Sequence, residues 1–306
     1  MLDYKPSQSS NMFIHRNSVI LVLSVVTLLT MTGCLPKKKA ENPVLKIDSN
    51  LKRRDKIEQL YNLGWIAGSG GNFELAINQF KAVLRQDPRH VGATHDYGLA
   101  LAKTGKLRQA IEYFHRALEL NPEYAEAYYN LSTAYYRMEQ PDLGREYLEK
   151  CLELNPNHNK ALLRKGELAE LRGEVRVATQ TYIQYLKIYP LDPQVRAKLG
   201  SLYFQQGLDE NAKIELLKAV KKIGTSDIFY QLGVIYHRQG QVKRAASYYK
   251  QVLTKDPNHI DALISSGEIF EKTGNLRDAL IHYERAFGLE PDNSYVRGKI
   301  RKLRQG

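Results

Sequence analysis

Cysteine is nearly absent from this sequence, which has only Cys34 and Cys151 among its 306 residues. Two cysteines cannot form the disulfide framework that stabilises many small secreted domains. Glycine-rich phosphate-binding loops are missing as well, because neither G-x-G-x-x-G nor G-x-x-x-x-G-K-S/T occurs. No set of His, Cys and carboxylate residues has the spacing of a metal site. We therefore expect no metal ion, no cofactor and no structural disulfide.

Signatures of catalysis are lacking too. An active site needs a nucleophile beside a base, paired carboxylates on facing elements, or a loop that binds phosphate. None of these patterns is visible in the sequence. The sequence therefore predicts no catalytic residues and a protein that is not an enzyme.

A pattern of about 34 residues recurs from residue 57 to the C-terminus. In residues 226–259, apolar side chains three and four positions apart define one helical face, Gly240 ends that helix, and a second apolar stripe follows. Each unit is therefore predicted to be a helical hairpin. The positions that define this unit are Phe229, Leu232, Gly233, Tyr236, Ala245, Tyr249 and Pro257.

Prolines mark the predicted ends of the second helices. They are spaced 34 residues apart, except for one gap of 67 in which Gly224 replaces the proline. The third unit departs from the pattern, with Ser132, Glu139 and Gly144 in place of the usual glycine, glycine and alanine. The prolines are Pro88, Pro122, Pro156, Pro190, Pro257 and Pro291.

These spacings resemble the W-x2-L-G-x2-Y, A-x3-F and P pattern of the tetratricopeptide repeat. The resemblance covers residues 57–306 and implies an all-α solenoid, a right-handed superhelix of seven hairpins. Residues 294–306 are predicted to form a basic capping helix. The predicted units are 57–90, 91–124, 125–158, 159–192, 193–225, 226–259 and 260–293.

The repeat pattern explains the positions of one cysteine and three histidines. Cys151 occupies the place of Ala117, Ala219 and Ala286 in other units, so it is predicted to be a small buried core residue. His90, His158 and His259 are each the last residue of a unit. Equivalent positions of different units lie on separate levels of a solenoid, so these histidines cannot converge on a metal ion.

The N-terminal residues 1–33 are predicted to be a signal peptide, with Met12 as an alternative start. Residues 18–31 are apolar, follow Arg16, and are fewer than the roughly 20 residues of a membrane span. Residues 31–34, MTGC, resemble the lipobox of bacterial lipoproteins, which implies lipidation of Cys34. Leu35 after the cysteine favours the outer membrane, facing the periplasm, in a Gram-negative host. The alternative is an uncleaved anchor with cytoplasmic repeats, which the lysines 37–39 support.

Residues 34–56 are predicted to be the lipidated cysteine and a flexible basic tether. From residue 35 onward this segment carries +5 of the net charge of +12. It is either a solvated spacer or a site for anionic lipid head groups. A sequence pI of about 9.4 also raises the possibility of nucleic-acid binding. Export and the spread of acidic residues over the repeats argue against it, so we expect no nucleic-acid partner.

The first helices of tetratricopeptide units line a concave groove, and the resemblance implies that this groove binds a protein partner. Exposed aromatic residues there suit recognition, because they offer a large contact area at a low entropic cost. The alternative is that these rings pack against neighbouring units. The predicted peptide-binding residues are Tyr61, Asn62, Trp65, His95, Tyr129, Asn130, Tyr136, Lys160, Arg164, Lys198, Phe204 and Tyr230.

Three of these residues resemble part of a carboxylate clamp. Asn130, Lys160 and Arg164 match three of its five positions, whereas His95 and Leu99 replace the other two residues. The resemblance implies an acidic group of the partner at this point. The alternative is that Lys160 and Arg164 form an ion pair with Glu126, Glu167 or another nearby carboxylate.

The sequence thus predicts a lipid-anchored scaffold or adaptor for protein partners in the cell envelope. The combination of a lipobox and tetratricopeptide repeats resembles the pilotins, lipoproteins that help the secretin channels of type IV pili to assemble, and this is the most concrete interpretation. A cytoplasm-facing scaffold and an envelope enzyme are the alternatives. The sequence does not determine the oligomeric state.

Overall fold

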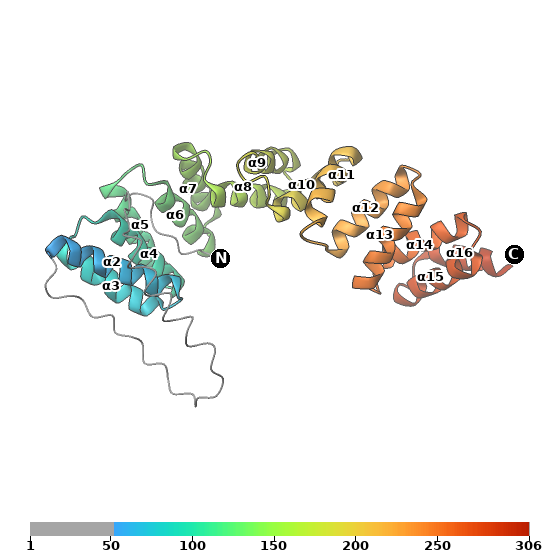
Figure 1. The fold of residues 1–306 in the computed structure, drawn as a ribbon, viewed down its shortest axis with the longest axis horizontal. Coiled ribbons are helices and arrows are strands. Elements are labelled where there is room, and N and C mark those ends of the chain that lie inside the picture. Colours follow the sequence, from blue (N-terminus) through green and yellow to red (C-terminus); the bar gives the residue numbers. More distant parts are fainter. Residues whose placement is uncertain (1–51, 306) are drawn as a thin grey trace, which may run out of the picture. The chain divides into compact units, whose positions relative to one another are not determined.

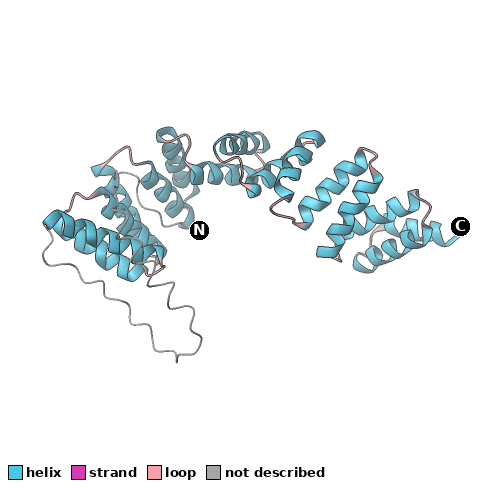
Figure 2. Ribbon diagram, viewed as in Figure 1, coloured by secondary structure: helices cyan, strands magenta, loops and turns pink. Residues whose placement is uncertain are grey.

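The computed structural model describes residues 52–305. Within this range all regular secondary structure is helical, which confirms the all-α fold (Figure 2). The predicted signal peptide, Cys34 and the tether up to residue 51 lie outside the described residues. The first helices of the hairpins are α2 (Arg53–Ser69), α4 (Val91–Lys103), α6 (Ala125–Arg137), α8 (Asn159–Leu171), α10 (Pro193–Gln205), α12 (Ser226–Arg238) and α14 (Ile260–Lys272). The second helices are α3 (Phe73–Gln86), α5 (Leu107–Leu120), α7 (Pro141–Leu154), α9 (Val175–Ile188), α11 (Asp209–Val220), α13 (Val242–Lys255) and α15 (Leu276–Leu289).

These helices belong to two compact units. The first unit ends at Pro156 and contains α2 to α7, and the second begins at Asn157 and contains α8 to α16 (Figure 1). In both units each first helix packs mainly on the second helix of its own hairpin. The last helix, α16 (Ser294–Gln305), packs on α15 and buries Val296 and Ile300.

The first helix begins earlier than the apolar pattern predicts. α2 starts at Arg53, inside the segment predicted to be tether. Arg53 donates a hydrogen bond to the backbone oxygen of Gln86 at 2.8 Å, which ties this end of α2 to the end of α3. Residues 53–56 lack apolar side chains, so periodicity alone could not find this turn.

The small residues of the repeat permit close packing within each hairpin. A Cβ atom at Gly200 would lie 2.7 Å from Cγ of Leu216, so α10 and α11 leave no room for a side chain. In the third repeat glycine stands in the second helix instead, where a Cβ atom at Gly144 would lie 2.7 Å from the Tyr136 ring. Gly144 thus makes room for a ring of the first helix of its own hairpin.

Cys151 is fully buried, as predicted from the alanines at its position in other repeats. Desolvation of the thiolate raises the pKa of the thiol to about 12, and the charge of Glu126 acts in the same direction. The thiol therefore stays protonated and behaves as a small apolar group of the core.

The turn between the two helices of a hairpin uses a left-handed residue. Six of these residues are glycines, and in the third repeat Glu139 adopts a φ of 60° instead. A side chain in this conformation costs about 1–2 kcal/mol relative to ordinary helical backbone. Glu139 thus keeps the turn at an energetic cost that glycine avoids.

The last residue of each repeat is the N-cap of the next first helix. The Nδ1 atoms of His90, His158 and His259 accept hydrogen bonds from backbone amides three residues later, at 3.0, 3.2 and 3.3 Å. Asp192 and Thr225 do the same with side-chain oxygens. A ring nitrogen that accepts must be unprotonated, so these histidines cap their helices in the neutral form.

Candidate functional site

The predicted groove residues all belong to first helices, and we call the exposed side of the first helices within each unit the first-helix face. The first unit contributes seven of them, and the second unit contributes five. Those of the first unit are Tyr61, Asn62 and Trp65 on α2, His95 on α4, and Tyr129, Asn130 and Tyr136 on α6. Those of the second unit are Lys160 and Arg164 on α8, Lys198 and Phe204 on α10, and Tyr230 on α12.

Four residues of the first unit are buried in one hydrogen-bond network. His95 Nδ1 lies 2.8 Å from Asp96 Oδ1, and His95 Nε2 lies 2.7 Å from the Asn130 amide nitrogen. Tyr61 donates to the other carboxylate oxygen of Asp96 at 2.7 Å. Because a carboxylate only accepts, His95 Nδ1 carries the proton and Nε2 accepts from Asn130.

This network joins three consecutive first helices, α2, α4 and α6. His95, Asp96 and Asn130 are 1%, 0% and 4% exposed, so their polar groups form hydrogen bonds within the protein rather than with a ligand. Sequence reasoning assigned Tyr61, His95 and Asn130 to the binding surface and missed Asp96 altogether. The structure instead places the polar ends of these side chains between the helices, where each has a partner.

Several aromatic residues predicted for the groove pack against other residues of their own repeat. The fifth residue of a repeat packs against its last residue: ring centroids are 4.9 Å apart for Tyr61 and His90, and 4.8 Å apart for Tyr230 and His259. Burial raises the pKa of the Tyr230 hydroxyl above its ordinary value. Tyr136 packs on Gly144, as described above, so these three rings contribute to the packing of the repeats.

The second unit has an open pocket on its first-helix face. It measures about 420 Å³ and is lined by Arg164, Glu167, Glu170, Leu171 and Lys198. The Leu171 side chain is 81% exposed. α8 and α10 thus present an apolar side chain beside two cations and two carboxylates, and two of the predicted residues, Arg164 and Lys198, meet here.

Charges inside this pocket are partly neutralised. Lys198 Nζ lies 3.0 Å from Glu170 and 4.0 Å from Glu167. The Tyr182 hydroxyl also donates to Glu170, and burial together with this carboxylate raises the pKa of that phenol. Lys198 thus has carboxylate partners within the protein, whereas the alternative of an ion pair was predicted for Lys160 and Arg164.

The structure does not bring the three clamp residues together in one compact unit. Asn130 belongs to the first unit and donates its amide to His95, whereas Lys160 and Arg164 belong to the second. Asn62 is exposed, and Trp65, Tyr129 and Phe204 are half-buried. Phe204 also lies under the Arg238 guanidinium, 5.1 Å from the ring centroid.

Two further properties concern only the described residues. Between residues 52 and 305, no three His, Cys, Asp or Glu side chains come together in a way that could hold a metal ion. Over the same range, every helix is too short or too polar to cross a bilayer.

Family models of the tetratricopeptide repeat match most of the helical region. One model matches residues 61–125 and 95–137, a second matches 125–158 and 193–221, and a third matches 236–303. These matches cover all or part of every repeat except the one at residues 159–192.

Individual proteins with similar sequences match only parts of the chain. The human cell division cycle protein 16 homolog is 25% identical over 135 residues, which are 41% of this chain and 22% of that protein. The uncharacterized protein ycf37 of Cyanophora paradoxa is 31% identical over 107 residues, which are 33% of this chain and 62% of that protein. The chain thus spans less than two thirds of the length of either relative.

Solved structures share the fold. The structure titled as a functional characterisation of Pseudomonas aeruginosa pilF is 17% identical, with a TM-score of 0.51, and the match covers 70% of this chain and 96% of that one. The structure of Naa15/Naa10 bound to HypK-THB has a TM-score of 0.53 at 16% identity, over 82% of this chain and 39% of that one. The helical hairpins, the small residues where their helices touch and these family matches agree, and the chain is therefore a tetratricopeptide repeat protein.

Proposed function

We propose that this protein is a membrane-anchored adaptor that holds a segment of a protein partner on its first-helix face. Tetratricopeptide repeats typically serve as scaffolds, and the chain's family membership supports a role in protein interaction. The observation that carries the proposal is the pocket between α8 and α10, where exposed Leu171 lies beside Arg164 and Lys198. This arrangement suits a segment with an acidic residue next to an apolar one.

The ion pair of Lys198 with Glu170 does not prevent such binding. Both side chains are partly exposed, at 36% and 26%. Partly solvated pairs contribute only about 0–1 kcal/mol, so a ligand carboxylate can take over Lys198 at little cost. A ligand that also covers Leu171 gains apolar burial in addition.

The test is a double variant, Lys160→Ala with Arg164→Ala, on the first-helix face of α8. We expect it to weaken binding of a partner captured from membranes by mild cross-linking at least about tenfold, because an acidic group of the partner that is desolvated on binding would lose the cations that pair with it. The matched control is Arg176→Ala with Lys187→Ala, which removes two exposed cations from the second helix of the same repeat. Equal affinity of the two double variants for the partner would refute the assignment.

The anchor in this proposal is a lipid on Cys34, in the lipobox-like residues 31–34. Cys34→Ser should release the protein from membranes and abolish labelling by a fatty-acid analogue. If the wild type carries no acyl label and the variant still fractionates with membranes, the alternative of an uncleaved anchor with cytoplasmic repeats takes its place.

The concrete setting that we propose is assembly of the cell envelope, with secretin assembly in type IV pili as the first case to examine. The support is the combination of a lipobox-like sequence, Leu35 behind it, and a tetratricopeptide array. Identification of the cross-linked partner tests this setting separately from the binding site. A partner outside the envelope would contradict the setting and leave the pocket assignment intact.

A further inference from the structure

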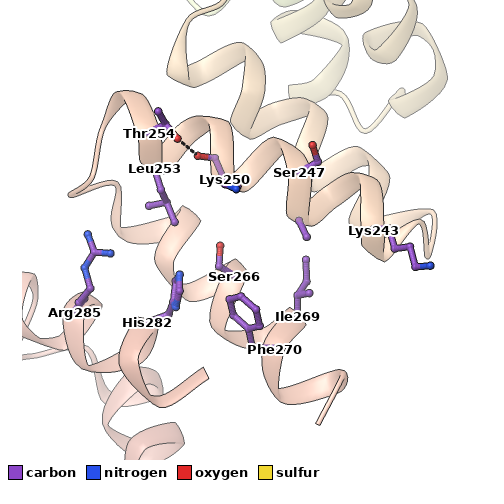
Figure 3. A pocket seen from close by; sticks show the side chains of 11 residues that line it. Lys243, Ser247, Lys250, Leu253, Thr254, Ser266, Ile269, Phe270, His282 and Arg285 are labelled. Atoms are coloured by element: carbon purple, nitrogen blue, oxygen red, sulfur yellow. Dashed lines mark hydrogen bonds between the residues drawn. The ribbon is translucent and has the colours of Figure 1, made fainter. Parts of the chain in front are cut away.

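A larger hollow lies in the second unit between two second helices, α13 and α15. It measures about 630 Å³, with α13 and α15 as its walls and α14 beneath them. Figure 3 shows Lys243 and Lys250 along one wall and His282 and Arg285 along the other. We call it the second-helix pocket. It shares no residue with the pocket between α8 and α10 that Arg164 and Lys198 line.

The floor of the second-helix pocket is apolar. Leu253 of α13 and Ile269 and Phe270 of α14 line it, and the His282 ring lies 5.0 Å from the Phe270 ring. Ile269 is 4% exposed and fixed in the core, so the floor is preformed. A concave apolar floor with a polar rim is the usual form of a binding site rather than of a solvated surface.

The rim is positively charged and lacks acidic residues. No carboxylate lines the pocket, and α13 contains four Lys and Arg residues but no Asp or Glu. Within the described part of the chain, the ammonium groups of Lys243 and Lys250 form no ion pair. Arg285 donates to the backbone oxygen of Pro257 at 2.7 Å, which holds its guanidinium at the rim.

Most carboxylates of α14 and α15 have partners outside the pocket, and the remaining one, Asp261, acts on Tyr230 of α12 and does not line the pocket. Glu268 accepts from Tyr295, Glu271 pairs with Lys299, and Glu284 pairs with Arg304. Asp278 accepts from the Asn275 amide at 2.6 Å. Glu271 and Glu284 are thus paired with cations, and no carboxylate of α14 or α15 lines the pocket, so the charged groups at its rim are cations.

The repeat fold itself does not require this charge. On α13 the face that lines the pocket has Lys243, Ser247, Lys250 and Thr254. The same four positions of the repeat on α7 are all acidic: Asp142, Glu146, Glu149 and Glu153. Because two hairpins of one fold carry opposite charges at equivalent positions, the lysines of α13 are not needed for packing.

We propose that the second-helix pocket binds an acidic amphipathic segment of a protein partner, at a site separate from the first-helix face. Lys243 and Lys250 are seven residues apart, which places them about 10 Å apart along the helix axis. Carboxylates two helical turns apart on a bound helix match that distance, and apolar side chains between them cover the Leu253 and Phe270 floor. Cations above an apolar floor thus select the segment by both charge and shape.

A membrane surface or a nucleic acid fits the pocket less well. Both would be attracted by the lysines, yet the apolar groups are recessed between helices, where a flat bilayer surface does not reach. A phosphate backbone gains nothing from a buried apolar floor. The apolar part of the site therefore favours a polypeptide.

The probe for the test is a fluorescent helical peptide with glutamates seven residues apart and leucines between them. It is titrated against the full chain, and against Lys243→Glu with Lys250→Glu. We expect the double reversal to weaken binding about tenfold or more, and added salt to weaken binding to the wild type. The matched control is Lys221→Glu with Lys222→Glu, which makes the same charge change at exposed residues of this unit outside the pocket.

Two further measurements separate the proposed site from its alternatives. A peptide with serines in place of the leucines should bind about tenfold more weakly, because it cannot cover the floor. Lys160→Ala with Arg164→Ala should leave peptide binding unchanged, which keeps this test independent of the first-helix site.

The proposal is overturned if the pocket and control reversals bind the peptide equally, or if the serine peptide binds as well as the leucine peptide. It is also overturned if the wild type ignores the peptide but binds anionic phosphatidylglycerol vesicles through Lys243 and Lys250. In that last case the pocket recognises a lipid surface.

Discussion

Gly200→Ala should destabilise the second unit, although alanine is the better helix former. Replacing a helical glycine by alanine in an open position gains about 1 kcal/mol. At Gly200 the new methyl carbon would lie 2.7 Å from Cγ and 2.8 Å from Cδ2 of Leu216, well inside the ordinary contact distance of about 3.5–4.0 Å. It would also lie 3.2 Å from the Leu216 backbone nitrogen, so rotation of the leucine alone cannot relieve the overlap. Overpacking of this kind costs about 1–3 kcal/mol, which outweighs the gain in helix propensity.

The control for this substitution is Gly298→Ala on α16, where an added Cβ atom meets nothing within 4 Å. That variant should be stabilised by roughly 0.5–1 kcal/mol. Urea unfolding measures both changes, and hydrogen exchange locates them: protection should fall first in α10 and α11 and their neighbours. Equal stabilisation by the two alanines, or uniform loss of protection along the chain, would refute the packing argument.

Three other substitutions or conditions test separate features. His259→Ala should cost about 1 kcal/mol and raise hydrogen exchange at the start of α14, whereas His259→Asn keeps an acceptor for the Ala262 amide and should retain most of the stability. Glu139→Gly should raise the free energy of unfolding by about 1 kcal/mol in urea titrations, because it relieves a left-handed backbone at φ 60°; no gain would mean that the turn is unstrained. Cys151 should resist thiol reagents at pH 8 until the protein unfolds, because burial raises the pKa of the folded thiol to about 12. The unfolded thiol ionises nearer 8.5, so the stability contributed by Cys151 should be fully present below that pH and be lost as pH rises toward 12.

The hairpins could be predicted because a single frame of about 34 residues fixes them. Periodic apolar positions identify both helices of every repeat, and small residues identify where the helices touch. The departure of the third repeat was visible in the sequence as Ser132 and Gly144, but the contact that Gly144 permits was not. Only the structure shows that the Tyr136 ring occupies the space left by Gly144.

The candidate site was less predictable because residue spacing does not tell which way a polar side chain turns. Tyr61, His95 and Asn130 occupy groove positions in the frame, yet each finds a polar partner between the helices. Asp96, one residue after His95, bonds to Tyr61 and His95, and no spacing rule marks such an acceptor. The histidine caps did have a signal, since Asp192 and Thr225 occupy the same position in other repeats and are common N-cap residues.

The position of the caps bears on how such arrays can be cut and rejoined. The residue that caps a first helix belongs, by the repeat frame, to the preceding hairpin, as His259 does for α14. A block of residues 226–259 moved to another array would take with it the cap of its successor and leave its own, Thr225, behind. Recombination between repeats is therefore tolerated best when the junction falls just before the cap, so that each transplanted hairpin brings the acceptor on which its first turn depends.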